Sequence, residues 1–82
     1  MYDIILSKSA AKYLDKLNKK DRERIIKALE KLRFRPDSFL KKLVGKDNYR
    51  LRVGNYRLII DLKRNKLIVL VLKIGHRKNI YK

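Results

Sequence analysis

The chain is 82 residues long, which suits a single domain, 1–82, near the lower size limit for independent folding. It has 24 Lys and Arg against 8 Asp and Glu, a formal net charge of +16, and it has no cysteine. Disulfides and thiolate chemistry are therefore excluded, and the charge predicts a polyanionic partner, nucleic acid first and an acidic protein second. Because no apolar run approaches the roughly 18 residues of a membrane span, and residues 1–6 do not resemble a signal peptide, we expect a cytoplasmic protein without membrane contact.

The N-terminal part of the chain predicts one strand and a helical hairpin. Residues 2–6 are mostly apolar and form the expected first strand. Ser7 can cap a helix over about 7–17, whose apolar side chains recur at helical spacing. A second amphipathic helix is expected over about 20–34, with Asp21 interacting favourably with the dipole of its first turn. The polar faces of both helices are mostly Lys and Arg, which we interpret as ordinary solvated surface.

Pro36 is expected to end the second helix, because the residue before a proline is disfavoured in the helical conformation. The segment 37–48 that follows is interpreted as a connection between the helices and the remaining strands. Within it, we expect Leu40 and Leu43 to pack on the core and Gly45 to make a turn.

A β-hairpin is predicted over 48–53 and 56–62, because Gly54-Asn55 is a two-residue turn signal between two alternating runs. A two-residue loop determines the register of the strands. The expected pairs are Val53 with Tyr56, Arg52 with Arg57, Leu51 with Leu58, and Arg50 with Ile59.

The two faces of this hairpin differ in character, since side chains alternate along a strand. One face is apolar: Tyr49, Leu51, Val53, Tyr56, Leu58 and Ile60. The other carries Arg50, Arg52 and Arg57, and like charges at opposed positions destabilise a hairpin. An anion such as phosphate, held by guanidinium groups, would turn that repulsion into attraction. The alternative is a solvated outer face on a very basic protein.

A third strand of the meander is expected after a turn at 64–66. The run Leu67–Leu72 is apolar without interruption, which is typical of a central strand, and Gly75 lets this strand end. The first strand is then its natural second neighbour. We therefore predict an α+β fold: an N-terminal strand, a helical hairpin, and a three-stranded antiparallel meander, with both helices on one face of the sheet.

The order of three motifs resembles the RelE/ParE superfamily of toxin–antitoxin systems. They are Leu-x-Gly at 43–45, Tyr-Arg-Leu-Arg-x-Gly-x-Tyr-Arg-Leu at 49–58, and Gly-His-Arg-x-x-x-Tyr at 75–81. The resemblance covers nearly the whole chain. It implies a RelE-like toxin that cleaves messenger RNA in the ribosome, is inhibited by a cognate RelB-like antitoxin, and binds operator DNA as the toxin–antitoxin complex.

The resemblance also implies the site residues. Basic residues on the hairpin, a C-terminal arginine and a near-terminal tyrosine carry over as Arg50, Arg52, Arg57, Arg77 and Tyr81, with His76 beside the arginine. Lys78 is added as an RNA-binding candidate because it lies in the same basic tail. ParE-like relatives share the scaffold, but they inhibit DNA gyrase and lack much of this set.

The residues favour chemistry without a cofactor or a metal, because the acids lack metal-ligand spacing and paired carboxylates are absent. The RNA 2′-hydroxyl would attack the adjacent phosphorus, which needs a base, an acid and positive charge on the phosphoryl oxygens. RelE-like toxins often have lysines where this chain has Arg50 and Arg52, and arginine is a poor general base. His76 is therefore the best acid/base candidate, with a structural role as its alternative. A ParE-like gyrase inhibitor and a non-catalytic nucleic-acid-binding co-repressor remain open alternatives.

Overall fold

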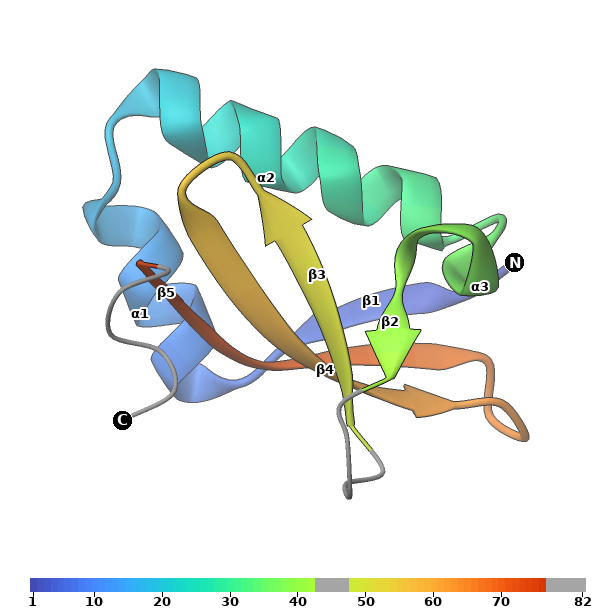
Figure 1. The fold of residues 1–82 in the computed structure, drawn as a ribbon. Coiled ribbons are helices and arrows are strands. Elements are labelled where there is room, and N and C mark those ends of the chain that lie inside the picture. Colours follow the sequence, from blue (N-terminus) through green and yellow to red (C-terminus); the bar gives the residue numbers. More distant parts are fainter. Residues whose placement is uncertain (43–47, 77–82) are drawn as a thin grey trace.

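The computed structural model describes residues 1–42 and 48–76 and has an α+β architecture (Figure 1). Its strands form one sheet in the order β1-β5-β4-β3-β2, in which β1 runs parallel to β5 and the other neighbours are antiparallel. The predicted class, and the placement of the first strand beside the central one, are confirmed. The elements are β1 (Asp3–Leu6), α1 (Lys8–Lys16), α2 (Lys19–Leu32), α3 (Pro36–Phe39), β2 (Lys41–Lys42), β3 (Tyr49–Val53), β4 (Tyr56–Lys63) and β5 (Ile68–His76).

Side-chain caps begin both long helices. The Ser7 hydroxyl accepts a hydrogen bond from the Ala10 amide at 3.1 Å and donates one to the Leu72 carbonyl at 2.8 Å. The cap predicted at Ser7 is therefore confirmed, and it also ties the start of α1 to β5. Asn18 caps α2 by accepting a hydrogen bond from the Asp21 amide at 2.8 Å.

None of the helices in the described part of the chain has the length and apolar character of a membrane span.

The segment around Pro36 holds more structure than the sequence predicted. Helix α2 ends at Leu32, and Arg35 lies outside the helical region at φ −142° and ψ 69°, as expected before a proline. Pro36 then occupies the first position of α3, where its missing N–H costs nothing. Interpreting 37–48 as a connection alone was therefore wrong, because it contains most of α3 and all of β2. Leu40 packs against the core as predicted, whereas Leu43 and Gly45 lie outside the described residues.

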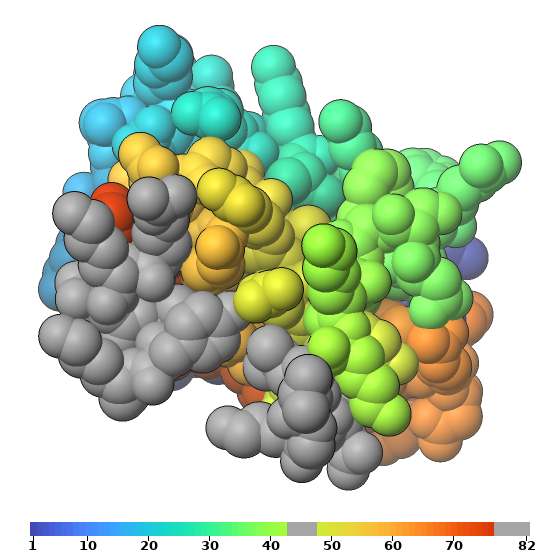
Figure 2. Space-filling view, viewed as in Figure 1, coloured from blue at the N-terminus to red at the C-terminus, as the bar shows by residue number. Residues whose placement is uncertain are grey.

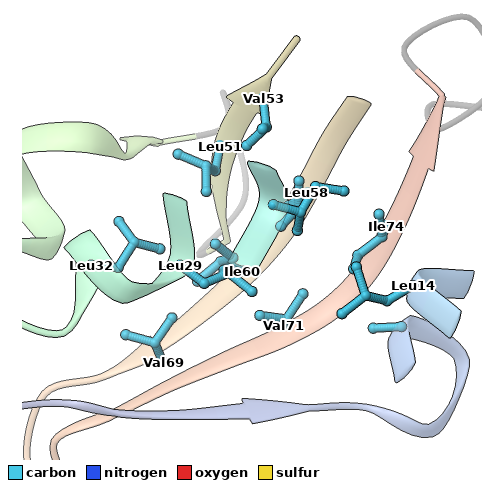
Figure 3. Packing of buried hydrophobic residues seen from close by; sticks show 12 residues of the cluster. Leu14, Leu29, Leu32, Leu51, Val53, Leu58, Ile60, Val69, Val71 and Ile74 are labelled. Atoms are coloured by element: carbon cyan, nitrogen blue, oxygen red, sulfur yellow. The ribbon is translucent and has the colours of Figure 1, made fainter. Parts of the chain in front are cut away.

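The hairpin has the predicted register throughout, from Val53–Tyr56 at the turn to Tyr49–Ile60 at the far end. Gly54 adopts φ +57°, a conformation that side-chain-bearing residues rarely take. The apolar face of the hairpin packs against α1 and α2 in one buried cluster (Figure 3). That cluster consists of Ala10, Leu14, Ile25, Leu29, Leu32, Leu51, Val53, Leu58, Ile60, Val69, Val71 and Ile74.

Strand β5 is longer than predicted and contains an irregularity. The expected limits of 67–72 were wrong, since β5 runs from Ile68 to His76 and Gly75 continues the ladder instead of ending it. The register shifts between Ile59 and Ile60 of β4, so the core-facing positions of β5 change from odd to even numbers. Its central position between β1 and β4 explains why apolar residues occur on both faces.

Candidate nucleic-acid interface

Arg50, Arg52 and Arg57 project from the sheet face opposite the hydrophobic core. They alternate along β3 and β4 with the buried Leu51 and Leu58, so they share the uncovered face. In Figure 2 the side chains of β3 and β4 meet those of the short strand β2 at this surface. The face that the sequence assigned to the arginines is therefore the face on which the structure has them.

A hollow of about 150 Å³ lies on this face and joins residues from α3, β2, β3 and β4. The described residues that line it are four cations and one aromatic residue, without an acid: Phe39, Lys41, Arg50, Arg52 and Arg57. We call this set the basic hollow. Its composition favours an anionic ligand with an apolar portion.

Two pairs of like charges face each other directly across the strands of the basic hollow. Arg52 is the register partner of Arg57, and Lys41 is the register partner of Arg50. Directly opposed like charges destabilise a sheet by roughly 0.2–1 kcal/mol each. Neither pair contributes to the stability of the fold, and a bound polyanion would offset the repulsion.

Arg57 carries the buried side-chain atoms that lack a hydrogen-bond partner among the described residues. Its Nε and Nη1 atoms are buried, and neither has a hydrogen-bond acceptor within the described residues. A buried donor without an acceptor costs about 1–3 kcal/mol, and more when the group is charged. Because Arg57 also lines the basic hollow, its guanidinium is a candidate for binding a phosphate oxygen there.

The nearby carboxylates are engaged with other cations. Asp37 binds Arg64 through two hydrogen bonds, Nη2 to Oδ1 at 2.6 Å and Nη1 to Oδ2 at 3.0 Å. Hydrogen bonding to Arg64 is the main cause that lowers the pKa of Asp37 from its ordinary value of 3.8. Asp61 lies 2.9 Å from the Lys63 ammonium. Within residues 1–42 and 48–76, neither of these carboxylates therefore neutralises a cation of the basic hollow.

His76 lies on the opposite, helix-covered side of the sheet. It is the register partner of Tyr56, and the two rings meet edge to face with centroids 6.1 Å apart. Tyr56 in turn contacts Tyr13 at 6.4 Å and donates a hydrogen bond to Asp21 at 2.8 Å. That bond to a carboxylate, assisted by desolvation, raises the pKa of Tyr56 above its ordinary 10.0. The structure thus separates His76 from the three hairpin arginines.

The remaining predicted site residues are in the C-terminal tail. Arg77, Lys78 and Tyr81 lie outside the described residues, so their predicted roles stay predictions.

Phe39 and Lys41 are members of the basic hollow that the sequence did not single out. One signal was present for Phe39: Pro36 followed by Asp37 is typical of the first turn of a new helix. Lys41 offered no such signal, because a two-residue strand of lysines has neither periodicity nor β propensity. Its position depends on pairing with β3.

The chain matches the family model of the ParE toxin of type II toxin–antitoxin systems, parDE, over residues 4–81. It is also similar to solved structures of toxin–antitoxin complexes. A chain of the intact Escherichia coli RelBE complex is 27% identical with a TM-score of 0.81, covering 93% of this chain and 96% of that one. A chain of the Pyrococcus horikoshii OT3 RelE–RelB complex is 28% identical with a TM-score of 0.82, covering 95% and 97%. Among curated protein sequences there is no significant match.

Proposed function

Since the chain belongs to the RelE/ParE superfamily and is a RelE-like toxin of a type II toxin–antitoxin system, we propose that it is an endoribonuclease that cuts messenger RNA on the ribosome. The observation that carries this proposal is the basic hollow, whose four cations are left without acidic partners among the described residues. Such a cluster on the open face of a sheet suits the phosphodiester backbone of RNA.

In the proposed reaction the 2′-hydroxyl of one nucleotide attacks the adjacent phosphorus. The bond from phosphorus to the 5′-oxygen of the next nucleotide breaks, leaving a 2′,3′-cyclic phosphate and a 5′-hydroxyl. Arg57 would hold a non-bridging oxygen through its guanidinium group, and Arg50 and Arg52 would stabilise the charge that grows on the phosphoryl group. Lys41 would contact a neighbouring phosphate.

The 2′-hydroxyl must lose a proton and the leaving 5′-oxygen must gain one, and water would carry both protons in this scheme. Arg77 would bind the phosphate or lie at the leaving oxygen, Lys78 would contact the RNA, and Tyr81 would stack on a base or orient the backbone. His76 keeps an indirect role in this scheme. It packs on Tyr56 and directly precedes Arg77 in the sequence, so we propose that it helps to position the backbone next to Arg77.

The proposed inhibitor is a cognate RelB-like antitoxin, since the chain's relatives from Escherichia coli and Pyrococcus horikoshii were solved as complexes with RelB. A net charge of +16 favours an acidic partner, and covering the basic hollow would block RNA. We further propose that the toxin acts in the cytoplasm and that its antitoxin complex binds operator DNA.

A second function, inhibition of DNA gyrase, is favoured by one observation: the family model that the chain matches is that of ParE toxins. Primer extension on cellular messages after induction separates the two. Cuts inside codons of translated RNA, with intact chromosomal DNA, are the outcome expected of the ribonuclease. Intact messages with broken DNA would instead establish gyrase as the target.

The same assay tests the site. A folded Arg57→Ala/Arg77→Ala double variant should leave messages intact, whereas the control Lys27→Ala, on the exposed face of α2, should cut as the wild type does. Message cleavage and growth arrest at the wild-type level by the double variant would refute the assignment of the active site to the arginines.

A further inference from the structure

Phe39 presents an aromatic ring to the same hollow as the four cations. It is the last residue of α3, its side chain is 46% exposed, and it lines the basic hollow together with Arg50 and Arg57. Exposure alone carries no argument, because single exposed apolar residues are normal on protein surfaces, and Phe34 is 67% exposed. The distinction is that Phe34 is not among the residues of the hollow.

The position of Phe39 is set by several contacts. Pro36 is buried at the start of the single turn of α3, and Asp37 is tied to the β4–β5 turn by both hydrogen bonds from Arg64. The same Arg64 donates to the Tyr49 hydroxyl of β3 at 3.3 Å. These contacts attach α3 to the sheet, so the ring stands at a defined place beside the cations.

The ring has no aromatic partner of its own in the described part of the chain. The ring contacts there join Tyr13, Tyr56 and His76 on the other side of the sheet. An exposed aromatic face beside guanidinium groups is the combination with which proteins bind single-stranded nucleic acid, because phosphates pair with the cations and bases stack on the ring.

We propose that Phe39 is a base-stacking residue that receives one nucleobase of a single-stranded RNA whose phosphates are held by Lys41, Arg50, Arg52 and Arg57. This inference rests on the proposed function in that RNA is the ligand, and it adds a binding residue that acts on the base. Stacking is tolerant of sequence because every base has a π face, so the ring would bind RNA without selecting one codon.

The test measures binding of the purified full chain to two fluorescent hexanucleotides by anisotropy at one fixed salt concentration. One is hexa-adenylate and the other carries abasic residues throughout, and both have 2′-O-methyl groups so that neither can be cleaved. The variants are Phe39→Ala and Phe39→Trp, with Phe34→Ala as the matched control on the neighbouring exposed phenylalanine.

We expect the wild type to bind hexa-adenylate better than the abasic strand, and Phe39→Ala to lose roughly 5- to 100-fold in affinity for hexa-adenylate alone. Phe39→Trp should retain the preference, and Phe34→Ala should match the wild type on both strands. The difference between the losses of affinity for the two oligonucleotides isolates the contact between ring and base. A variant that merely disturbs α3 would weaken binding to both oligonucleotides equally.

Three results would overturn the inference. If Phe39→Ala weakens binding to both oligonucleotides equally, the role of Phe39 is structural. If it weakens binding to neither, Phe39 does not belong to the RNA site. Normal RNA binding combined with escape from antitoxin inhibition would reassign the ring to a protein interface. None of these results depends on RNA cleavage, so the two proposals can fail separately. If primer extension shows intact messages while Phe39→Ala still weakens binding to hexa-adenylate alone, the nuclease proposal is refuted and the stacking role of Phe39 is retained.

Discussion

Arg52 and Arg57 face each other directly across β3 and β4, on the side of the sheet opposite the hydrophobic core. The second of the two has buried donors without an acceptor among the described residues. Within the described residues this position therefore carries a repulsion and two unsatisfied donors, both of which a bound anion would offset.

The first prediction concerns charge removal at Arg57. Arg57→Gln should lower the rate of message cleavage by about 10²-fold, because one charge-stabilising contact is lost. Its melting temperature should equal or exceed that of the wild type, since the repulsion with Arg52 disappears. Thermal unfolding and primer extension on the same preparation measure both effects. Activity lost in step with stability would contradict a role in catalysis.

Leu58 tests the assignment of the two faces. It is fully buried against the helices, so Leu58→Ala should destabilise the protein by roughly 2–5 kcal/mol through loss of packing and a residual cavity. Urea unfolding followed by circular dichroism gives the value. Ile26→Ala is the control, because Ile26 is 42% exposed and its truncation should cost less than about 1 kcal/mol. Equal losses of stability in the two variants would contradict the burial of Leu58 in the core.

The salt dependence of the RNA affinity measures how many phosphate contacts the protein makes. Each contact to a single strand adds about 0.7 to the slope of log K against log salt concentration, because counterions are released. Arg50→Gln should therefore reduce the slope by about 0.7, whereas Lys27→Gln on α2 should leave it unchanged. Titrations at four or more salt concentrations suffice. A slope that Arg50→Gln does not alter would place the RNA elsewhere.

The ion pair between Asp37 and Arg64 makes a prediction about pH. Because Arg64 lowers the pKa of Asp37 below 3.8, the pair stabilises the attachment of α3 above that pH. The contribution is lost as the pH falls through the lowered value. Arg64→Ala should return the Asp37 pKa toward 3.8, which carboxyl NMR titration detects. An Asp37 titration that is the same in both proteins would show that the pair is absent in solution.

Leu67 offers a site for stabilisation away from the basic hollow. It adopts φ +55°, a conformation that costs a residue with a side chain roughly 1–2 kcal/mol and glycine little. Leu67→Gly should raise the free energy of unfolding by up to about 1 kcal/mol. This net gain is smaller than the strain released, because glycine also increases the conformational entropy of the unfolded chain. Leu67→Ala keeps the strained backbone and should bring no gain. A lower melting temperature for Leu67→Gly would refute this account.

The hairpin shows how much local chemistry can determine. Gly54-Asn55 sets a two-residue turn, the turn sets the register, and strict alternation then assigns Leu58 to the core and Arg57 to the open face. The helix start at Ser7 follows in the same way from a hydroxyl that caps the adjacent backbone. Each of these features depends on residues a few positions apart, so the sequence alone was sufficient to predict them.

Contacts between distant parts of the chain could be identified only from the tertiary structure. The sequence by itself determined the composition of the arginine face, because alternation along two adjacent strands is a local property. Only the fold decided that Phe39 and Lys41 join that face, since α3 reaches it through the pair of Asp37 with Arg64 and β2 through pairing with β3. It likewise decided that His76 packs on Tyr56, because the irregularity between β4 and β5 changes which residues of β5 face the helices. Strand pairing across long separations and a one-residue shift in register leave no periodic signal in the chain, and these decide which side chains share a site.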